Sequence, residues 1–400
     1  MNFRWINWLS QVGSITRMSL QTISERRGAA AAAAFGIAGV VGVFVAVLSI
    51  AEGFHRALLV SGNPGVALVM RAGSDSEMMS FLSGQETRLI LDAPGIARAE
   101  HGPLASAQLF TVINLPKRST GTDANVPLRG VDAAAFDVHG EVRFLAGRRF
   151  LPGRNEIVVG RGAAHEFAGL DLNATLRVGR YAWTVVGLFE AGGGLPESEI
   201  WTDAAVLQAA YQRGNSYQTV LARLETPEAF ADFERHLEND PRLNVKALRQ
   251  TDYYAEQSTS VYRLITGLGS LIAALMATGA VFGALNTMYS AVATRTREIA
   301  TLRALGFGAS PIVISILIES LCLALAGGVF GGSLAYLVFD GYRAATMNWQ
   351  SFSQVAFAFD VTPLLLLQGL LWAVFIGLIG GLLPALRAAR IPLARALREL

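Results

Sequence analysis

Four stretches of the chain are apolar for long enough to cross a membrane. A bilayer core is about 30 Å thick, so a spanning helix needs about 20 predominantly apolar residues. The stretches that reach this length are 29–51, 264–293, 311–339 and 361–386. A single acid, Glu319, interrupts the third. The pattern therefore predicts an α-helical membrane domain of four transmembrane helices.

The segment 52–263, between the first and second stretches, has the mixed pattern of an α/β domain. Short β-branched runs bounded by glycine or asparagine predict strands, at 66–70, 156–159, 175–178, 183–186 and 245–248. Phe230, Phe233 and Leu237 recur at helical spacing behind Pro227 and predict a helix there. The expected fold class is four membrane helices with one large α/β extracytoplasmic domain inserted between helices 1 and 2.

Arginines predict the orientation, because basic residues gather in the cytoplasmic flanks of membrane helices. They are dense in 1–28, 294–310 and 387–400, and sparse in 340–360. We therefore expect both termini in the cytoplasm, with the loop 340–360 and the inserted domain 52–263 outside.

Two of the apolar stretches have a second interpretation. A cleaved signal peptide competes for 29–51, but this run and the segment before it are longer than a typical signal sequence. The stretch 264–293 would be about 45 Å long as a helix, which exceeds the bilayer core. We expect it to continue outward as a stalk through 250–262, which holds no glycine or proline.

Composition excludes several kinds of chemistry. A net charge of +2 gives no nucleic-acid footprint. Lys117 and Lys246 are the only lysines and neither follows a glycine, so the chain has no Walker phosphate loop for ATP hydrolysis. One cysteine, Cys322, and five scattered histidines give no metal-ligand spacing. We expect no catalytic residue, metal or cofactor on this chain, and hence no enzyme.

Glycines recur at four-residue spacing within the predicted spans. The four pairs are Gly279 with Gly283, Gly327 with Gly331, Gly328 with Gly332, and Gly377 with Gly381. Glycines let helix backbones approach closely in lipid. Packing within this chain is favoured over packing against a second membrane subunit.

Glu319 is an acid inside a span, and such acids are functional candidates. It lies within three turns of the cytoplasmic end of its span. A position at the membrane interface or an interhelical hydrogen bond is therefore favoured over proton coupling. A proton-driven transporter usually needs several such acids, and this span has one.

The loop 294–310 carries the most informative pattern. Ile299, Leu302 and Leu305 recur every three residues and predict one apolar face of a short helix. The polar positions are Arg295, Arg297, Glu298 and Arg303. Gly306 is suited to end this helix, and Ser310 with Pro311 to begin the next. A short amphipathic helix here is either a docking surface or a helix on lipid headgroups.

The sequence of 297–306 resembles the signature of the FtsX-like permease domain of MacB-type ABC transporters. The resemblance continues through Glu319 and the glycines at 327–332, and on to Leu383-Pro384-Ala385, Arg390 and Pro392. More weakly, 128–131, 147–148, 156–160 and 185–188 resemble the MacB-like periplasmic core domain. Together these pieces cover most of the chain.

The resemblance implies a transporter of two permease subunits and two ABC ATPase subunits in the bacterial inner membrane. ATP and Mg²⁺ would be cofactors of the ATPase, on a separate chain because fewer than thirty residues precede the first span here. The loop residues Arg297 to Gly306 would dock on that ATPase as a coupling helix. The second permease would be identical or paralogous, and a periplasmic adaptor and membrane lipid are further implied partners. The N-terminal segment, with Trp5 and Trp8, would be an interfacial helix or a brace for the ATPase contact.

Three functions compete. The first is export or mechanotransmission, acting on a lipid, lipoprotein, peptide or hydrophobic small molecule. The second is a division-type regulator that activates a periplasmic cell-wall hydrolase. The third is a proton-coupled carrier, which the shortage of intramembrane charge opposes. The size of the inserted domain favours the exporter.

Overall fold

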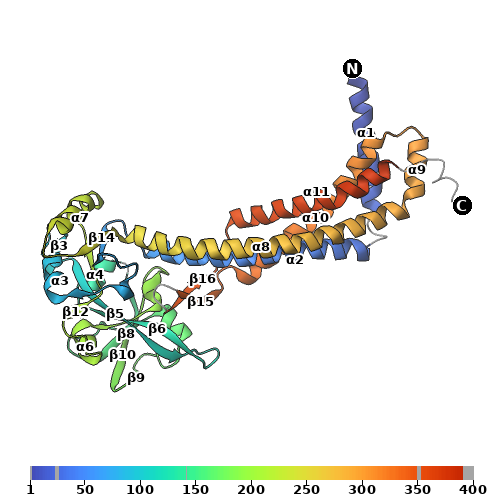
Figure 1. The fold of residues 1–400 in the computed structure, drawn as a ribbon. Coiled ribbons are helices and arrows are strands. Elements are labelled where there is room, and N and C mark those ends of the chain that lie inside the picture. The colour runs from blue at the N-terminus through green and yellow to red at the C-terminus, as the bar shows by residue number, and fades with distance from the viewer. Residues whose placement is uncertain (1, 23–26, 141, 349–352, 391–400) are drawn as a thin grey trace. The chain divides into compact units, whose positions relative to one another are not determined.

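The computed structural model describes residues 2–22, 27–140, 142–348 and 353–390 (Figure 1). The chain divides into two compact units. One contains 1–52, 263–342 and 359–400, and the other contains 53–262 and 343–358. We call them the membrane unit and the sheet unit and describe each by itself.

The long helices account for the membrane unit. They are α1 (Asn2–Gln21), α2 (Arg27–Ser61), α8 (Gln250–Thr294), α10 (Ala309–Phe339) and α11 (Pro363–Ala389), with the short α9 (Thr296–Ala304) between α8 and α10. Among the described residues, α2, α8, α10 and α11 are long and apolar enough to cross a membrane. The fold class predicted from the sequence is therefore confirmed. The helix α8 runs unbroken for 45 residues, and α2 extends ten residues beyond the predicted end of its apolar stretch.

Glycines determine how closely the helices of the membrane unit pack. A side chain at Gly327 or Gly331 would meet backbone carbonyl groups of α2 closer than real Cβ atoms approach. Gly377 and Gly381 are held equally tightly against α10, where Ala324 and Ser320 face them. Gly328 and Gly332 likewise face Ala373 and Leu366 of α11, so these three pairs let α10 pack closely against α2 and α11.

The remaining glycine pair lies in a different environment. No described atom of the chain lies within 4 Å of the Cβ position of Gly279 or Gly283, and both residues are exposed on α8. Leu275 and Phe282 beside them are each 67% exposed. Packing within this chain therefore explains three of the four predicted pairs.

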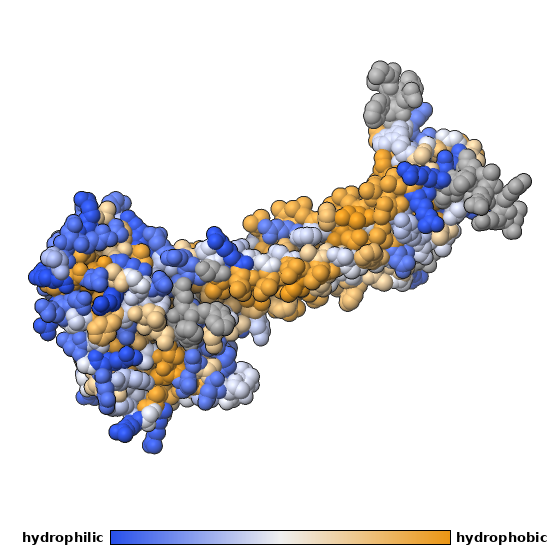
Figure 2. Space-filling model, viewed as in Figure 1, coloured by the Kyte–Doolittle hydropathy of each residue, from blue (hydrophilic) through white to orange (hydrophobic). Residues whose placement is uncertain are grey.

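Surface hydropathy follows the same division. Figure 2 shows orange, hydrophobic surface over the long helices and blue, hydrophilic surface over the sheet unit. Exposed leucines of α8, α10 and α11, including Leu268, Leu337 and Leu371, contribute to the apolar band. Such a band is what a bilayer requires of the helices that it surrounds.

The sheet unit is built on a mixed sheet of ten strands. Its path is β14 (Val245–Arg249), β1 (Val66–Arg71), β13 (Thr219–Arg223), β5 (Ala105–Pro116), β6 (Asp123–Val131), β11 (Ile200–Asp203), β8 (Glu156–Gly160), β10 (Tyr181–Glu190) and β7 (Arg143–Gly147), with β9 (Thr175–Val178) beside β10. The pairs β6–β11 and β8–β10 are parallel, and the other pairs are antiparallel. Short helices cover the sheet: α3 (Gly84–Leu91), α4 (Ala135–His139), α5 (Arg161–Glu166), α6 (Ala204–Ala210) and α7 (Phe230–Asn239).

The strand β5 joins the two halves of this sheet. Its residues 105–108 pair with β13, while 109–116 pair with β6. Each half has its own apolar core: Phe233 and Leu237 of α7 fill one, and Phe167 and Trp183 fill the other. A third buried cluster, which includes Phe136, Phe189 and Trp201, also lies in this unit, so the sheet unit is one domain with several cores.

The segment 340–360, predicted as a loop, contains a β-hairpin. Its strands β15 (Arg343–Asn348) and β16 (Ser353–Ala358) belong to the sheet unit. Ala356 N donates to Ser198 Oγ at 2.8 Å, which attaches the hairpin next to the short helix η3 (Leu195–Ser198). A segment that emerges between two membrane helices therefore forms part of the outer domain.

Candidate functional site

The short helix α9 forms as the sequence predicts. It ends at Ala304, and Gly306 follows with φ of +94°, a left-handed conformation that favours glycine at a helix C-terminus. The next helix begins earlier than expected, because Gly308 rather than Ser310 is the N-cap of α10. Ser310 Oγ instead accepts a hydrogen bond from Trp8 Nε1 of α1 at 3.1 Å.

One side of α9 is buried against the membrane unit. Ile299 packs in an apolar cluster with Ile15 of α1, Met288 of α8 and Ile312 of α10, and Leu302 is half-buried beside it. Leu305, predicted to share their face, is 73% exposed. Ile299 and Leu302 therefore fix the helix in place and are not free for a partner.

The opposite side of α9 is open. Arg297, Glu298, Thr301 and Leu305 are exposed there, whereas Arg303 is half-buried. The apolar residues exposed there are Ala304 and Leu305, and the others are polar. The structure thus separates the predicted coupling residues into an anchoring set and an exposed set.

A buried ion pair lies beneath α9. Arg295 Nη1 lies 3.4 Å from Glu319 Oε2, and the two side chains are 12% and 4% exposed. Arg295 sits in the turn between α8 and α9, and Glu319 lies in α10. Arg295 Nη2 also donates to the Ser19 carbonyl of α1 at 3.1 Å. The acid that interrupts the third span is therefore paired with an arginine of the loop 294–310.

The helix α1 is fastened across this junction by polar contacts. Ser19 Oγ pairs with Ser315 Oγ at 3.3 Å, and Gln11 Oε1 accepts from Gly308 N at 3.4 Å. Together with Trp8 and the Ser19 carbonyl, these contacts tie α1 to the turns on both sides of α9. The side chains of residues 2–6, including Trp5, lie outside the described part of the chain, as do residues 391–400.

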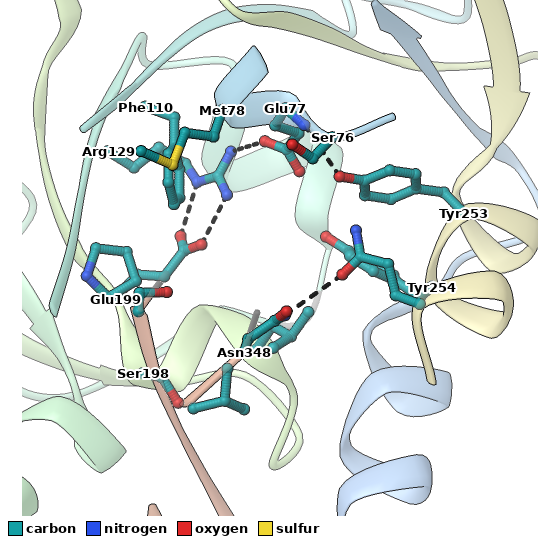
Figure 3. Close-up of a pocket in the computed structure, with 15 residues that line it drawn as sticks. Ser76, Glu77, Met78, Phe110, Arg129, Ser198, Glu199, Tyr253, Tyr254 and Asn348 are labelled. Atoms are coloured by element: carbon teal, nitrogen blue, oxygen red, sulfur yellow. Dashed lines mark hydrogen bonds and ion pairs between the residues drawn. The ribbon is translucent and has the colours of Figure 1, made fainter. Parts of the chain in front are cut away.

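The sheet unit holds a second polar site, a cavity built around Arg129 (Figure 3). Arg129 in β6 pairs with Glu199 through two hydrogen bonds of 2.8 and 2.7 Å and with Glu77 Oε2 at 2.6 Å. Its guanidinium also lies 5.1 Å from the centroid of the Phe110 ring, directly across the β5–β6 ladder. All three charged side chains are at least nine-tenths buried.

Burial and ion pairing determine the protonation states around this site. Burial opposes the charge on Glu199, but the ion pair with Arg129 and a hydrogen bond from Trp201 Nε1 bring its pKa below the ordinary value. Burial also opposes the charge on Arg129, yet its two acids raise its pKa well above the ordinary value. Burial and the nearby Arg129 charge lower the pKa of His139, whose ring packs at a tilt against Trp201, to about 4. At neutral pH the charged Arg129 and Glu199 thus lie close to a neutral imidazole, that of His139.

Sequence reasoning did not find this cavity. Its charged groups lie at positions 77, 129 and 199, and no short spacing links them. The signal within the sequence is the placement of Arg129 inside the otherwise apolar end of β6, where a charge needs a partner.

Comparison with known families identifies the chain. Residues 30–240 match the MacB-like periplasmic core domain, and residues 270–393 match the FtsX-like permease C-terminal domain. The chain belongs to the MacB-like permease family. It is a multi-pass membrane protein whose sheet unit is periplasmic, so the predicted family is confirmed.

The curated relatives of this MacB-like permease are distant and longer. It is 26% identical over 412 residues to the macrolide export ATP-binding/permease protein MacB 1/2 of Paracoccus denitrificans, covering 98% of this chain and 59% of the relative. It is 25% identical over 310 residues to the MacB protein of Escherichia coli K12, covering 72% and 46%. The chain therefore aligns with only part of proteins that are named as both ATP-binding and permease.

Solved outer domains are also similar to the MacB-like permease. The extracellular domain of the transporter YknZ from Gram-positive bacteria aligns at 15% identity with a TM-score of 0.35, over 46% of this chain and 99% of that domain. The periplasmic region of MacB from Actinobacillus actinomycetemcomitans aligns at 10% identity with a TM-score of 0.38, over 50% and 94%.

Proposed function

We propose that this MacB-like permease is the membrane subunit of an ABC transporter driven by a cytoplasmic ATPase. The 400 residues hold no Walker loop, so Mg²⁺ and ATP would bind on the ATPase. Hydrolysis there moves α9, and the permease converts that motion into work by its periplasmic domain. The cargo is a lipid, lipoprotein, peptide or hydrophobic small molecule. The curated relatives named for macrolide export fit the last class.

The observation that carries this proposal is the two-sided environment of α9. Its buried side is held by the cluster around Ile299 and lies over the Arg295–Glu319 ion pair, so a push on α9 reaches α8 and α10 directly. Its open side presents Arg297, Glu298 and Leu305. A closely packed anchor transmits displacement, because packed interiors have low compressibility.

The exposed face of α8 supports a second permease subunit. Gly279 and Gly283 lie there without a neighbour in the described chain, beside the exposed Leu275 and Phe282. Small residues at four-residue spacing let two helices approach in lipid. We propose that this face of α8 packs against the partner permease, identical or paralogous.

Docking on α9 is tested with the open-side residues. The full chain is purified with its ABC ATPase, and ATPase stimulation and co-purification are measured for Arg297→Glu and Leu305→Asp. Both variants are expected to lose stimulation while keeping normal thermal stability, because neither side chain is buried. Glu100→Ala, an exposed change in the periplasmic domain, is the matched control. Full stimulation by Leu305→Asp and Arg297→Glu would count against docking at α9.

Motion of the periplasmic domain is tested by crosslinking. Cys322 is the only native cysteine, so its replacement by serine gives a cysteine-free background. A cysteine at the exposed Met79 position then reports whether two outer domains change separation when the ATPase binds nucleotide. Crosslinking that is independent of nucleotide argues against mechanical transmission and favours a static role, such as activation of a hydrolase.

A further inference from the structure

We infer that the cavity in Figure 3 binds a small cation with N–H donors, an ammonium or a primary amine group. Six elements surround the cavity: the short helix η2 (Glu77–Met79), β5, β6, the segment 195–199, the periplasmic end of α8 and the β15–β16 hairpin. All of them belong to the sheet unit. The inference concerns this domain alone and does not depend on ATPase coupling.

The charge balance of the cavity calls for a cation. Arg129 contributes one positive charge against the two negative charges of Glu77 and Glu199, and all three side chains are buried. A buried charge without a partner is strongly unfavourable. Glu199 is satisfied, because Arg129 reaches both of its oxygens and Trp201 reaches one. The excess negative charge therefore lies on Glu77.

Glu77 has room for a further donor. Arg129 reaches only its Oε2, and within the described residues no hydrogen bond reaches its Oε1. The Arg129 nitrogens are already engaged by Glu77, Glu199 and Gln108 Oε1. A ligand that donates hydrogen bonds and carries a positive charge would complete the pairing of Glu77.

A second and independent observation is the hydroxyl of Tyr254. This side chain is 6% exposed, lines the cavity and points into it in Figure 3. Among the described residues its hydroxyl has no hydrogen-bond partner. A buried hydroxyl normally has one. The Tyr254 oxygen, which lines the same cavity as Glu77, can therefore accept a hydrogen bond from a bound donor. The rings of Phe110, Tyr253 and Tyr254 add aromatic walls, which favour ammonium groups.

Size and ligand chemistry narrow the choice of cation. The cavity volume is about 40 Å³, enough for about three water-sized groups. No group of three or more His, Cys, Asp or Glu suited to a metal ion occurs in the described part of the chain. Divalent cations such as Ca²⁺ need six or more oxygen ligands. An ammonium group fits a single carboxylate and a hydroxyl better.

Occupation of the cavity would join the periplasmic end of α8 to the turn that carries Glu77. Tyr253 Oη already accepts from Glu77 N at 3.1 Å, and Gln257 Oε1 accepts from Asn348 Nδ2 at 3.4 Å. A cation between Glu77 and Tyr254 would add a third polar link between this part of α8 and its surroundings. The ligand would thereby stiffen the start of the stalk.

The experiment titrates the full-length purified protein with methylammonium chloride and follows its thermal unfolding at constant ionic strength. Sodium chloride and tetramethylammonium chloride are the comparison salts. Neither cation has an N–H donor, and tetramethylammonium is also too large for the cavity. A saturable rise in Tm is expected with methylammonium alone. An equal response to all three salts means that the cavity holds water, and the inference is then overturned.

Two variants place the response at this cavity. Glu77→Gln removes the charge, and Tyr254→Phe removes only the hydroxyl and keeps the ring, so the second remains informative if the first folds poorly. Each is expected to weaken the apparent affinity for methylammonium about tenfold or more, as for one lost hydrogen bond to a charged group. Glu100→Gln, an exposed acid on the same domain, is the control and should not change it. Unchanged affinity in Tyr254→Phe and in a folded Glu77→Gln would overturn the assignment.

Discussion

The buried pair of Arg295 and Glu319 makes a quantitative prediction. Replacing Glu319 with alanine leaves the guanidinium of Arg295 buried without its acid. Removing one partner of a buried ion pair costs about 3–5 kcal/mol of unfolding free energy. The pair distance of 3.4 Å exceeds the about 2.7–2.9 Å of strong charge-assisted hydrogen bonds. Arg295 also keeps its bond to Ser19. We therefore expect a loss near the lower limit, about 3 kcal/mol.

A double-mutant cycle separates the ion pair from general damage to the fold. Arg295→Met keeps an apolar stem, and its combination with Glu319→Ala removes both charges. The double variant should be less destabilised than the two single variants added together, by about 1–3 kcal/mol. Denaturant titration in mixed micelles measures each free energy, and Glu298→Ala is the exposed control on α9. Effects that add within about 0.5 kcal/mol would refute the reasoning, because the two side chains would then be energetically independent.

Two further predictions concern glycine packing and pH. Gly331→Ala should destabilise the membrane unit by about 1–3 kcal/mol in thermal unfolding, because the added methyl group meets the Ala38 carbonyl. Gly279→Ala should leave the stability of the isolated chain unchanged and weaken only its association with a second permease. Stability should also fall as the pH drops from 6.5 towards 4, because the unfolded state binds a proton at His139 in this range while the folded state, with a pKa of about 4, does not. The full loss of unfolding free energy is on the order of 3 kcal/mol. Unfolding free energies from urea titrations of wild type and His139→Gln should therefore diverge as the pH falls across this range. Parallel pH profiles of the two proteins would contradict the role of His139.

The membrane helices and the coupling helix were predictable because their signals are local. Apolar length alone located all four spans, and the absence of glycine and proline in 250–262 predicted the unbroken α8. Gly306 ended α9 as expected because a left-handed residue there is a property of the turn itself. The ladder of β5 and β6 was missed, although their alternating residues around the turn at 117–122 gave a local signal.

Other features depend on contacts that no local pattern encodes. Glu319 was expected at an interface or in an interhelical hydrogen bond, but its partner lies 24 residues away and was not identified. The hairpin at 343–358 was predicted as a loop; its two strands pair with each other, and its place in the sheet unit depends on a distant contact with Ser198. The amphipathic helix α9 was expected either to dock a partner or to lie on lipid headgroups, because the pattern does not say what an apolar face meets.

The position of β1 in the sheet constrains how the protein is made. Val66 to Met70 form the first strand after the first span, and each of these residues is at most 1% exposed in the fold. Both neighbours of this strand, β13 and β14, come from residues 219–249. The ribosome must therefore synthesise, and the secretion machinery export, more than 150 residues before β1 finds its first partner. Until then an apolar strand with both edges unpaired stands in the periplasm, where it is open to aggregation. Folding of the outer domain thus waits for contacts between segments far apart in the sequence, which makes it slow.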